Sequence, residues 1–251
     1  MTLHSDLDKI IFLETVDSTN QELKRRRSEF SGSNVLLISE EQTSGQGQQG
    51  RKWESAAGLG LWMSLFLSRE LSLAHDLHLL SLYAGVILQK TMAEQVGSHV
   101  SLKWPNDLMI GPKKCGGILT EIQWQGNQPA SIILGVGVNL RHQLEDFPTA
   151  LQDVATSLLL EGSSHPDRTS IMQSFITNFF KNMTLLNTGE ALAEAWNRHA
   201  YNPQGGFFWQ IKDRRVEGEF LGVNSAGEAQ VVIDNQLQCF RSGEIRLKER
   251  G

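Results

Sequence analysis

Short apolar runs separated by loops fill the middle of the chain and set the strongest limit on its fold. Gly126-Asn127 lies between the last two of these runs and is typical of a hairpin turn. The runs have the length and composition of β-strands, at His99–Lys103, Leu108–Ile110, Gly117–Trp124 and Ile132–Val138. This part of the chain is therefore predicted to form a β-sheet.

Further strands and one long helix precede this region. Strands are predicted from apolar runs at Lys9–Glu14, Val35–Ser39 and Leu61–Leu67. The turn after the first strand leads into a helix, with Ser18 or Thr19 as its N-cap and Glu22 in its first turn. Leu, Ala, Val and Ile recur with helical spacing over about 72–96, which predicts the longest helix of the chain.

The C-terminal part of the chain changes character. A helical pattern runs from about Pro166 to Arg198 and is broken by the sequence YNPQGG at 201–206. The residues that follow form short β runs, with glycines at expected turns at Gly218, Gly222, Gly227 and Gly243. The prediction is an α+β domain, with a mixed β-sheet flanked by helices, followed by a small barrel-like β domain.

The bulk composition is that of a folded protein with no sign of a nucleic-acid partner. The chain has 251 residues, 40% apolar and 20% charged, which suits one good-sized domain with a small appendage. A formal net charge of -5 gives no positive field that would attract DNA or RNA. The basic cluster Lys24–Arg27 is interpreted as the solvated face of a short helix or, alternatively, as a docking patch.

Cysteine usage and hydropathy bear on the compartment. Two cysteines, Cys115 and Cys239, lie far apart, which argues against a disulfide scaffold and fits a reducing compartment. The first residues do not have the pattern of a signal peptide, and no apolar stretch approaches the ~18 residues that span a membrane. We therefore expect a cytoplasmic protein without membrane contact.

The glycine-rich segment Gly45–Gly50 (GQGQQG) matches the dinucleotide fingerprint GxGxxG letter for letter. That fingerprint needs a strand directly before it and a helix after it, whereas five polar residues precede it here and no amphipathic pattern follows. A Walker A loop is also excluded, because Arg51 and Lys52 follow without Ser or Thr. The segment is either a plain surface loop or a mobile loop whose amides approach an anion, with Trp53 as a flat face for a base.

Three later segments carry further candidate site residues. In Lys103–Asp107 (KWPND), the proline places Asn and Asp where they can reach a ligand or hydrated Mg²⁺, although such a pair alone is usually a turn. Lys113–Glu121 (KKCGGILTE) brings two lysines into a strand through two glycines. Gly135–Asn139 (GVGVN) is a strand whose glycines let another group pack against bare backbone, and it ends in a side-chain amide.

Taken in order, these segments resemble the biotin protein ligase family, the biotin–[acetyl-CoA-carboxylase] ligases. The catalytic domain of that family carries an S-T-N turn, a glycine-rich loop ending before a Trp, K-W-P-N-D, K-x-x-G-I-L-x-E and a G-x-G-x-N strand. The resemblance is strong from Ile10 to Asn139, where Lys114 and Glu121 fall in register with the fourth element, and looser through 243–245. It implies a biotin/lipoate ligase catalytic domain at residues 1–203 and a small SH3-like β-barrel domain at 204–251.

The resemblance also implies a reaction in two steps. The biotin carboxylate attacks the α-phosphate of ATP to give biotinyl-5'-AMP and pyrophosphate, with Mg²⁺ on the nucleotide. A lysine of a biotin carboxyl carrier protein then attacks the mixed anhydride. Because the first step brings two anions together, cations and N–H donors have to stabilise the developing charge.

Site residues follow from their positions in the matched motifs. The expected catalytic cations are Lys114 and Arg51. Biotin is expected to contact Ser18, Thr19, Asn20, Gln42, Gly45, Gln46 and Gly117. ATP and the adenylate are expected to contact Gly47, Gln48, Gly50, Arg51, Trp53, Asn106, Asp107, Lys114 and Asn139. Asp107 is also the expected contact to Mg²⁺, through the nucleotide.

The glycine-rich loop departs from the family pattern. The family usually carries arginines where this chain has Gln46, Gln48 and Gln49, so that Arg51 alone remains of the set. Glutamine can donate hydrogen bonds, but it carries no charge and cannot make the bidentate, charge-assisted contact that an arginine makes to a phosphate. A lost charge-assisted hydrogen bond costs ~1.5–3 kcal/mol, so we expect a slower enzyme or one that retains its adenylate less well.

Two other functions compete with this interpretation. Lipoate ligases share the fold and the adenylate chemistry, but they carry an Arg-Arg pair before a serine and three glycines and lack the Trp-Pro of K-W-P-N-D. A non-catalytic biotin or nucleotide binder would explain the glutamines but not the retained Lys114, Asn106 and Asp107.

The resemblance also bears on domain content and assembly. About nine residues precede the first strand, so we expect no helix-turn-helix DNA-binding domain of the kind that repressor relatives carry. Relatives are often homodimers through the main sheet, and the run Leu61–Leu67 is a candidate for that contact, which the sequence leaves open.

Overall fold

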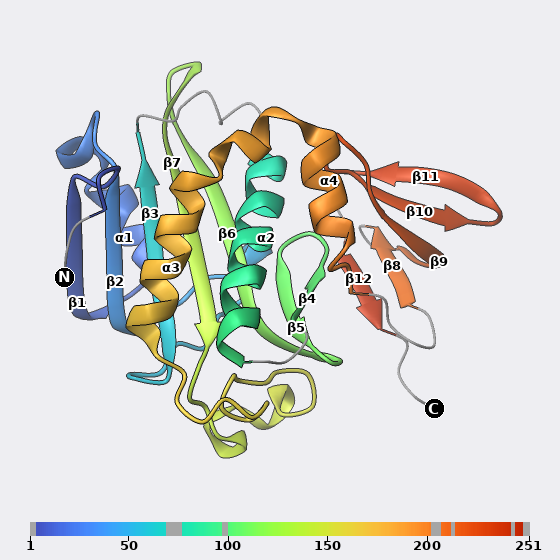
Figure 1. Ribbon diagram of the computed structural model, residues 1–251, viewed down its shortest axis with the longest axis horizontal. Helices are drawn as coiled ribbons and strands as arrows, with labels where there is room; N and C mark the ends of the chain where they lie inside the picture. The colour runs from blue at the N-terminus through green and yellow to red at the C-terminus, as the bar shows by residue number, and fades with distance from the viewer. Residues whose placement is uncertain are drawn as a thin grey trace.

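The computed structural model describes residues 4–68, 77–96, 100–201, 207–211, 214–241 and 244–247. Within these ranges a large mixed sheet has the strand order β1-β2-β3-β7-β6-β5-β4 (Figure 1). β1 and β2 are parallel, and every other neighbouring pair of this sheet is antiparallel. The strands are β1 Lys9–Val16, β2 Val35–Gln42, β3 Gly60–Leu67, β4 Val100–Lys103, β5 Asp107–Ile110, β6 Lys113–Gln125 and β7 Gln128–Asn139. The predicted mixed sheet of an α+β domain is confirmed.

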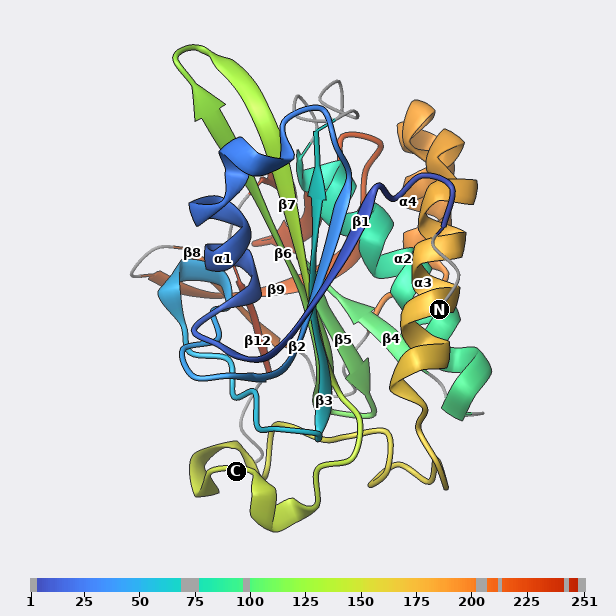
Figure 2. The same ribbon diagram turned by 90° about the vertical axis from the view of Figure 1, so that its left-hand side faces the viewer.

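Helices cover both faces of this sheet. α1 (Thr19–Arg25) lies on one face, and α2 (Leu77–Val96), α3 (Arg168–Lys181) and α4 (Gly189–Asn197) lie on the other (Figure 2). The sequence of α3 explains its position, because its buried residues recur at helical spacing, at Ile171, Met172, Phe175, Ile176, Phe179 and Phe180. No helix in the described part of the chain is long and apolar enough to cross a membrane.

Two apolar cores result from this layering. The larger core lies between the sheet and α2–α4, and the smaller one lies between the sheet and α1. β3 contributes to both, since Leu65 belongs to the larger core and Phe66 to the smaller. Every residue of β3 is buried and both of its edges are paired. The run Leu61–Leu67 is therefore part of the protomer's own core, and the hypothesis that it forms a homodimer contact is wrong.

The structure also corrects boundaries predicted from the sequence. β2 continues to Gln42, since Glu41 and Gln42 still pair with β1, so the polar segment begins inside a strand. The helical pattern from Pro166 to Arg198 contains two helices, with a 3-10 turn at Met183–Asn187 between them. β6 begins at Lys113, so both lysines of that motif already lie in the strand. The predicted helix start at 72–76, His99 and residues 202–206 lie outside the described residues.

Carboxylates pair with Lys24, Arg25 and Arg26 of the basic cluster Lys24–Arg27 at the end of α1. Arg25 makes two hydrogen bonds to Asp17, at 2.6 and 2.7 Å, and these hold the pKa of that carboxyl below its usual range. The further ion pairs are Arg25–Glu22, Arg26–Glu22, Arg26–Glu29 and Lys24–Glu121. The Arg27 side chain donates to the Lys24 carbonyl at 3.3 Å. The cluster is thus a helix end, as predicted.

A second, smaller sheet follows at the C-terminus. In the described residues its order is β11-β10-β9-β8-β12, with every neighbouring pair antiparallel. The strands are β8 Phe207–Ile211, β9 Arg214–Val223, β10 Ala229–Ile233, β11 Gln236–Phe240 and β12 Glu244–Leu247. The small C-terminal β domain is confirmed. Gly227 lies in a turn as predicted, but Gly218 and Gly222 lie inside β9, and Gly243 lies outside the described residues.

The two sheets are joined by specific contacts. The Asn197 side chain at the end of α4 donates to the Val223 carbonyl at 2.9 Å and accepts from the Val223 N–H at 2.8 Å. Trp104, from the KWPND segment, donates its indole N–H to the Gly227 carbonyl at 3.2 Å. Residues 202–206 carry the predicted domain boundary and lie outside the described part of the chain, so that boundary stays a prediction.

Candidate functional site

A cleft brings together most of the residues that the motifs single out. It encloses about 1330 Å³ of empty space, a volume that includes the open solvent at its mouth. The predicted site residues that line it are Ser18, Thr19, Asn20, Gln42, Gln46, Gly47, Gln48, Arg51, Trp53, Asn106, Asp107, Lys114, Gly117 and Asn139. Gly45 and Gly50 do not line it.

A buried polar pocket lies where α1 begins. Ser18 is the N-cap of α1, yet its side chain makes no capping hydrogen bond, and it is only 2% exposed. Gln42 Oε1 accepts from the Thr19 N–H at 2.8 Å and from its hydroxyl at 3.1 Å. Gln42 Nε2 donates to Ser55 Oγ at 2.8 Å, which fixes the amide orientation. Buried polar groups of this kind need hydrogen-bonding partners, so the pocket suits a small polar ring.

Two glycines of β7 make room for side chains of the cleft. An ideal Cβ at Gly135 would lie 2.5 Å from Asn20 Oδ1, and one at Gly137 would lie 2.8 Å from the Trp53 ring. Asn20 and Trp53 therefore pack directly on the bare backbone of β7. This confirms the interpretation that the GVGVN glycines admit another group, and it identifies both groups.

Gly135→Ala is expected to weaken ligand binding in the polar pocket. The new methyl group cannot coexist with the Asn20 amide, which would move and give up hydrogen bonds worth about 0.5–1.5 kcal/mol each. If the pocket holds biotin, its KM for biotin should rise about tenfold, with the ATP KM unchanged. Steady-state kinetics with each substrate varied in turn checks this. Equal biotin KM values for both proteins would contradict it.

The glycine-rich segment folds as a tight hairpin in this structure. Gln46 pairs with Lys52, and the Gly47 N–H donates to the Arg51 carbonyl at 2.7 Å. At the tip, Gln49 and Gly50 both have left-handed backbone conformations, with φ of 58° and 72°. Gly50 thus serves the turn, which explains why it does not line the cleft.

Gly45 has a similar structural role at the base of the hairpin. An ideal Cβ at this position would lie 2.5 Å from the Trp53 carbonyl, and the Trp53 N–H donates to the Gly45 carbonyl at 2.9 Å. Gly45 lets the two arms of the hairpin approach this closely, and the same approach brings Trp53 onto β7.

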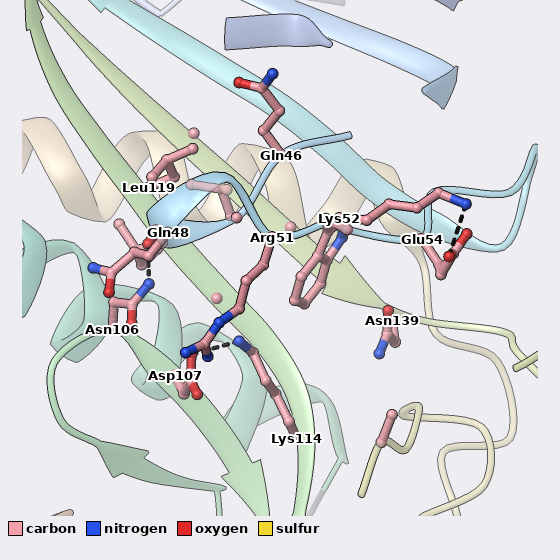
Figure 3. A pocket seen from close by; sticks show the side chains of 18 of the residues that line it. Gln46, Gln48, Arg51, Lys52, Glu54, Asn106, Asp107, Lys114, Leu119 and Asn139 are labelled. Atoms are coloured by element: carbon pink, nitrogen blue, oxygen red, sulfur yellow. Dashed lines mark hydrogen bonds and ion pairs between the residues drawn. The ribbon is translucent and has the colours of Figure 1, made fainter. Parts of the chain in front are cut away.

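Cations gather at one part of the cleft. Lys114 Nζ lies 2.5 Å from Asp107 Oδ1, and the Arg51 side chain points from the hairpin toward this pair (Figure 3). Lys114 Nζ also lies 5.0 Å from the centre of the Trp53 ring, within the range of a cation–π contact. Lys52 points elsewhere and pairs with Glu54 at 2.9 Å. Lys114 and Arg51 therefore lie together in this part of the cleft, whose lining also includes Lys52 and Lys103.

The neighbours of this cluster fix its geometry. Asn106 Nδ2 donates to the Ile118 carbonyl at 2.6 Å, and the Ile118 N–H donates to the Asn106 carbonyl at 2.9 Å. These bonds hold the KWPND loop against β6. An ideal Cβ at Gly117 would lie 3.5 Å from Lys114 Nζ, an ordinary contact distance, so Gly117 lies directly beside the lysine.

The sequence did not reveal one wall of the cleft. It belongs to the segment after β7 and consists of Phe147, Leu151, Val154 and Ala155. Lys114 holds this wall by backbone bonds, donating to the Val154 carbonyl at 2.8 Å and accepting from the Thr156 N–H at 2.9 Å. Asn139 Nδ2 donates to the Thr156 carbonyl at 3.0 Å. The signal in the sequence was a few apolar residues within a polar stretch. Because that pattern is common in loops, it did not indicate a wall of the cleft.

The region that builds most of the cleft matches a known family. Residues 12–139 match the sequence profile of the Biotin/lipoate A/B protein ligase family. The chain belongs to this family of protein ligases, as the resemblance of its motifs implied.

Individual relatives make the match more specific. The Bifunctional ligase/repressor BirA of Bacillus subtilis is 30% identical over 249 residues, which cover 95% of this chain and 74% of that protein. The Biotin--[acetyl-CoA-carboxylase] ligase of Mycobacterium tuberculosis is 34% identical over 160 residues, covering 61% of this chain and 56% of the relative. Among solved structures, the biotin protein ligase from Aquifex aeolicus in complex with biotin and ATP superposes with a TM-score of 0.81. It is 25% identical and is matched over 97% of this chain and 100% of that one.

Proposed function

We propose that this protein is an ATP-dependent biotin ligase. The biotin carboxylate displaces pyrophosphate from ATP, giving biotinyl-5'-AMP, and the biotinyl group is then transferred to a lysine of a biotin carboxyl carrier protein with release of AMP. The observation that carries the proposal is that a buried polar pocket, the cations Lys114 and Arg51 and an indole face line one cleft together. The relatives named for biotin ligation support it. A cytoplasmic location is part of the proposal and is consistent with two cysteines that form no disulfide.

The chemistry requires the two cations. A carboxylate and a polyphosphate repel each other, and the charge on the α-phosphate grows as the new bond forms. Lys114 contacts the carboxylate and the α-phosphate, and Arg51 contacts the phosphates from the hairpin side. Asp107 pairs with Lys114 at 2.5 Å and positions its ammonium group in the cleft. The substrate anions replace Asp107 as partners of the lysine.

The remaining residues divide between the two substrates. Biotin binds in the polar pocket and against the adjoining backbone, at Ser18, Thr19, Asn20, Gln42, Gln46 and Gly117. The nucleotide binds at Gly47, Gln48, Arg51, Trp53, Asn106, Asp107, Lys114 and Asn139. In this assignment Gly45 and Gly50 act through the hairpin conformation, and the adenine lies against Trp53.

Mg²⁺ is proposed to arrive with the nucleotide. Within the described residues no group of three His, Cys, Asp or Glu side chains could hold a metal ion by itself. Mg²⁺ commonly binds through one or two carboxylates together with substrate phosphates, and Asp107 in the cleft supplies one such carboxylate. The bound ion would neutralise phosphate charge, and Asp107 would be available to it once Lys114 engages the substrates.

The direct test is transfer of biotin to a carrier domain. Purified protein is mixed with biotin, ATP, Mg²⁺ and the host's own biotin carboxyl carrier domain, and labelling is followed by mass spectrometry. We expect a mass increase of one biotin that requires ATP. Release of pyrophosphate is measured in parallel, because a protein that only binds biotin would retain the ligand without releasing it. No labelling at high enzyme concentration would refute the proposed function.

Gln48→Arg is expected to slow the release of biotinyl-adenylate. Gln48 lines the cleft beside Asn106, and Lys52 does not occupy this position because it pairs with Glu54 (Figure 3). An arginine here could add a charge-assisted phosphate contact, worth ~1.5–3 kcal/mol, and most gains in affinity appear in the off-rate. Release of trapped radiolabelled adenylate after dilution should slow at least about tenfold. Equal release rates would show that the hairpin amides and Arg51 suffice.

A further inference from the structure

An ion pair outside the cleft is linked to the polar pocket by hydrogen bonds. Lys24 Nζ of α1 and Glu121 Oε1 of β6 lie 2.7 Å apart, and both side chains are less than a third exposed. Neither residue lines the cleft. Glu121 Oε2 accepts a hydrogen bond from Asn20 Nδ2 at 2.8 Å, and Asn20 does line the cleft. The ion pair therefore lies outside the cleft and contacts the cleft residue Asn20 through Glu121.

Glu121 determines which way the Asn20 amide points. A carboxylate has no proton to donate, so the part of the amide that faces it must be the NH₂ group. The same NH₂ lies 3.5 Å from the Leu119 carbonyl, which is also an acceptor. The amide oxygen consequently faces the other way, 2.6 Å from Ser64 Oγ.

The amide orientation then determines where the hydroxyl protons lie. Ser64 is fully buried and has one proton, which the Asn20 oxygen requires. Ser64 Oγ also lies 2.7 Å from Thr19 Oγ1, so a proton between these two oxygens has to come from Thr19. The other neighbour of this hydroxyl, Gln42 Oε1 at 3.1 Å, is an acceptor as well. Because the Ser64 proton goes to Asn20, Ser64 donates nothing to Thr19, and the lone pairs of the Thr19 oxygen stay available to the cleft while its own proton goes to Ser64 or Gln42. In the reverse direction Ser64 would donate to Thr19 and occupy one of these lone pairs.

We infer that Glu121, held by Lys24, is a positioning residue that sets the direction of this hydrogen-bond chain and so makes Thr19 an acceptor toward the ligand. The matching ligand group is an N–H donor, and the cyclic urea of biotin has two. The inference rests on the proposed function for the identity of the ligand. It also gives a source of specificity, because a ring without N–H groups, such as a dithiolane, would leave this buried acceptor unpaired.

Glu121→Gln tests the inference with little change in shape. A carboxamide can present either an oxygen or an NH₂ group, so the Asn20 amide is free to turn and the direction of the chain is lost. We expect the biotin KM to rise about five- to tenfold, the effect of one hydrogen bond. The ATP KM, and kcat at saturating biotin, should stay within about twofold of the wild-type values, because neither Lys24 nor Glu121 touches the cleft.

A double variant separates direction from structural support. In Asn20→Asp/Glu121→Gln the carboxylate moves to position 20, where it again presents an acceptor to Ser64 and accepts from the new amide at 121. Total charge beside Lys24 is unchanged. We expect the biotin KM to return to within about twofold of wild type. If Glu121 had a purely structural role, the biotin KM would not recover, because each substitution would disturb the packing of the network and the two effects would add.

The outcomes distinguish this inference from the proposed function. If the wild-type protein labels no carrier, the proposed function fails; if it labels the carrier but Glu121→Gln has a wild-type biotin KM, only the inference fails. A double variant no better than the single one also overturns it. Calorimetric titration with biotin in the absence of ATP repeats the comparison without turnover. Should Glu121→Gln not fold, Glu121→Ala serves instead, because it also removes the carboxylate that fixes the Asn20 amide. A raised biotin KM is then expected, and an unchanged one would contradict the inference.

Discussion

Replacing Lys114 with alanine is expected to lower the rate of adenylate formation by about 10²- to 10³-fold. A positioned charge or donor removed from the developing negative charge of a transition state typically has an effect of this size. Lys114 is held for that task by Asp107 at 2.5 Å, by the Trp53 ring and by backbone bonds to the wall segment. Since the charge acts mainly in the transition state, the loss should appear in kcat for pyrophosphate release.

Two controls make this prediction specific to Lys114. Lys113 is the matched control, because it is the preceding residue of β6 and its amine donates to the Gln152 carbonyl at 2.8 Å rather than facing the cleft. Lys113→Ala should keep activity within a few-fold of wild type. Lys114→Ala leaves the Asp107 carboxylate without its ion-pair partner, and the double variant Lys114→Ala/Asp107→Asn tests whether that carboxylate causes the loss of rate. We expect the double variant to be as slow as Lys114→Ala. An undiminished rate for Lys114→Ala would refute the catalytic assignment.

The motifs could be found from sequence because each is local and has a recognisable order. The S-T-N turn, the glycine-rich segment, KWPND and GVGVN each depend on a few adjacent residues, and the structure brings all of them to one cleft. The α+β class followed from the same local signals, since apolar runs of strand length are visible without knowing their partners. The failed dimer hypothesis for Leu61–Leu67 has the same origin. An apolar run indicates burial, but not whether the neighbour is the same chain or another.

The parts that sequence reasoning missed depend on contacts between distant residues. Ser64 and Glu121 join Asn20 only because β3, β6 and α1 meet, with sequence separations of 44 and 101 residues. The wall that includes Phe147 and Val154 is positioned by the backbone of Lys114, and a backbone contact leaves no mark on residue type. The glycines were recognised as sites of close approach, but the sequence could not say that Gly135 admits Asn20 and Gly137 admits Trp53.

Gly137→Ala is expected to raise the ATP KM by about 10- to 100-fold while leaving biotin binding nearly unchanged. The added methyl carbon would lie 2.8 Å from Nε1 and Cε2 of Trp53, so the indole has to leave its place on β7. Stacking of a base on an aromatic side chain is worth about 1–3 kcal/mol, and it is lost when the ring moves away. Because Lys114 Nζ lies 5.0 Å from the same ring, a smaller decrease in kcat should accompany the change in KM.

Gly135→Ala is the matched control, because it makes the same substitution two residues earlier on the same face of β7. The two variants should have opposite effects: Gly137→Ala weakens ATP binding, and Gly135→Ala weakens biotin binding. Titration of each protein with each substrate measures all four affinities. If both variants weakened both substrates equally, the damage would lie in the strand itself. A selective loss of ATP in Gly137→Ala would support the nucleotide site beside Trp53, and a wild-type ATP affinity would place the adenine elsewhere in the cleft.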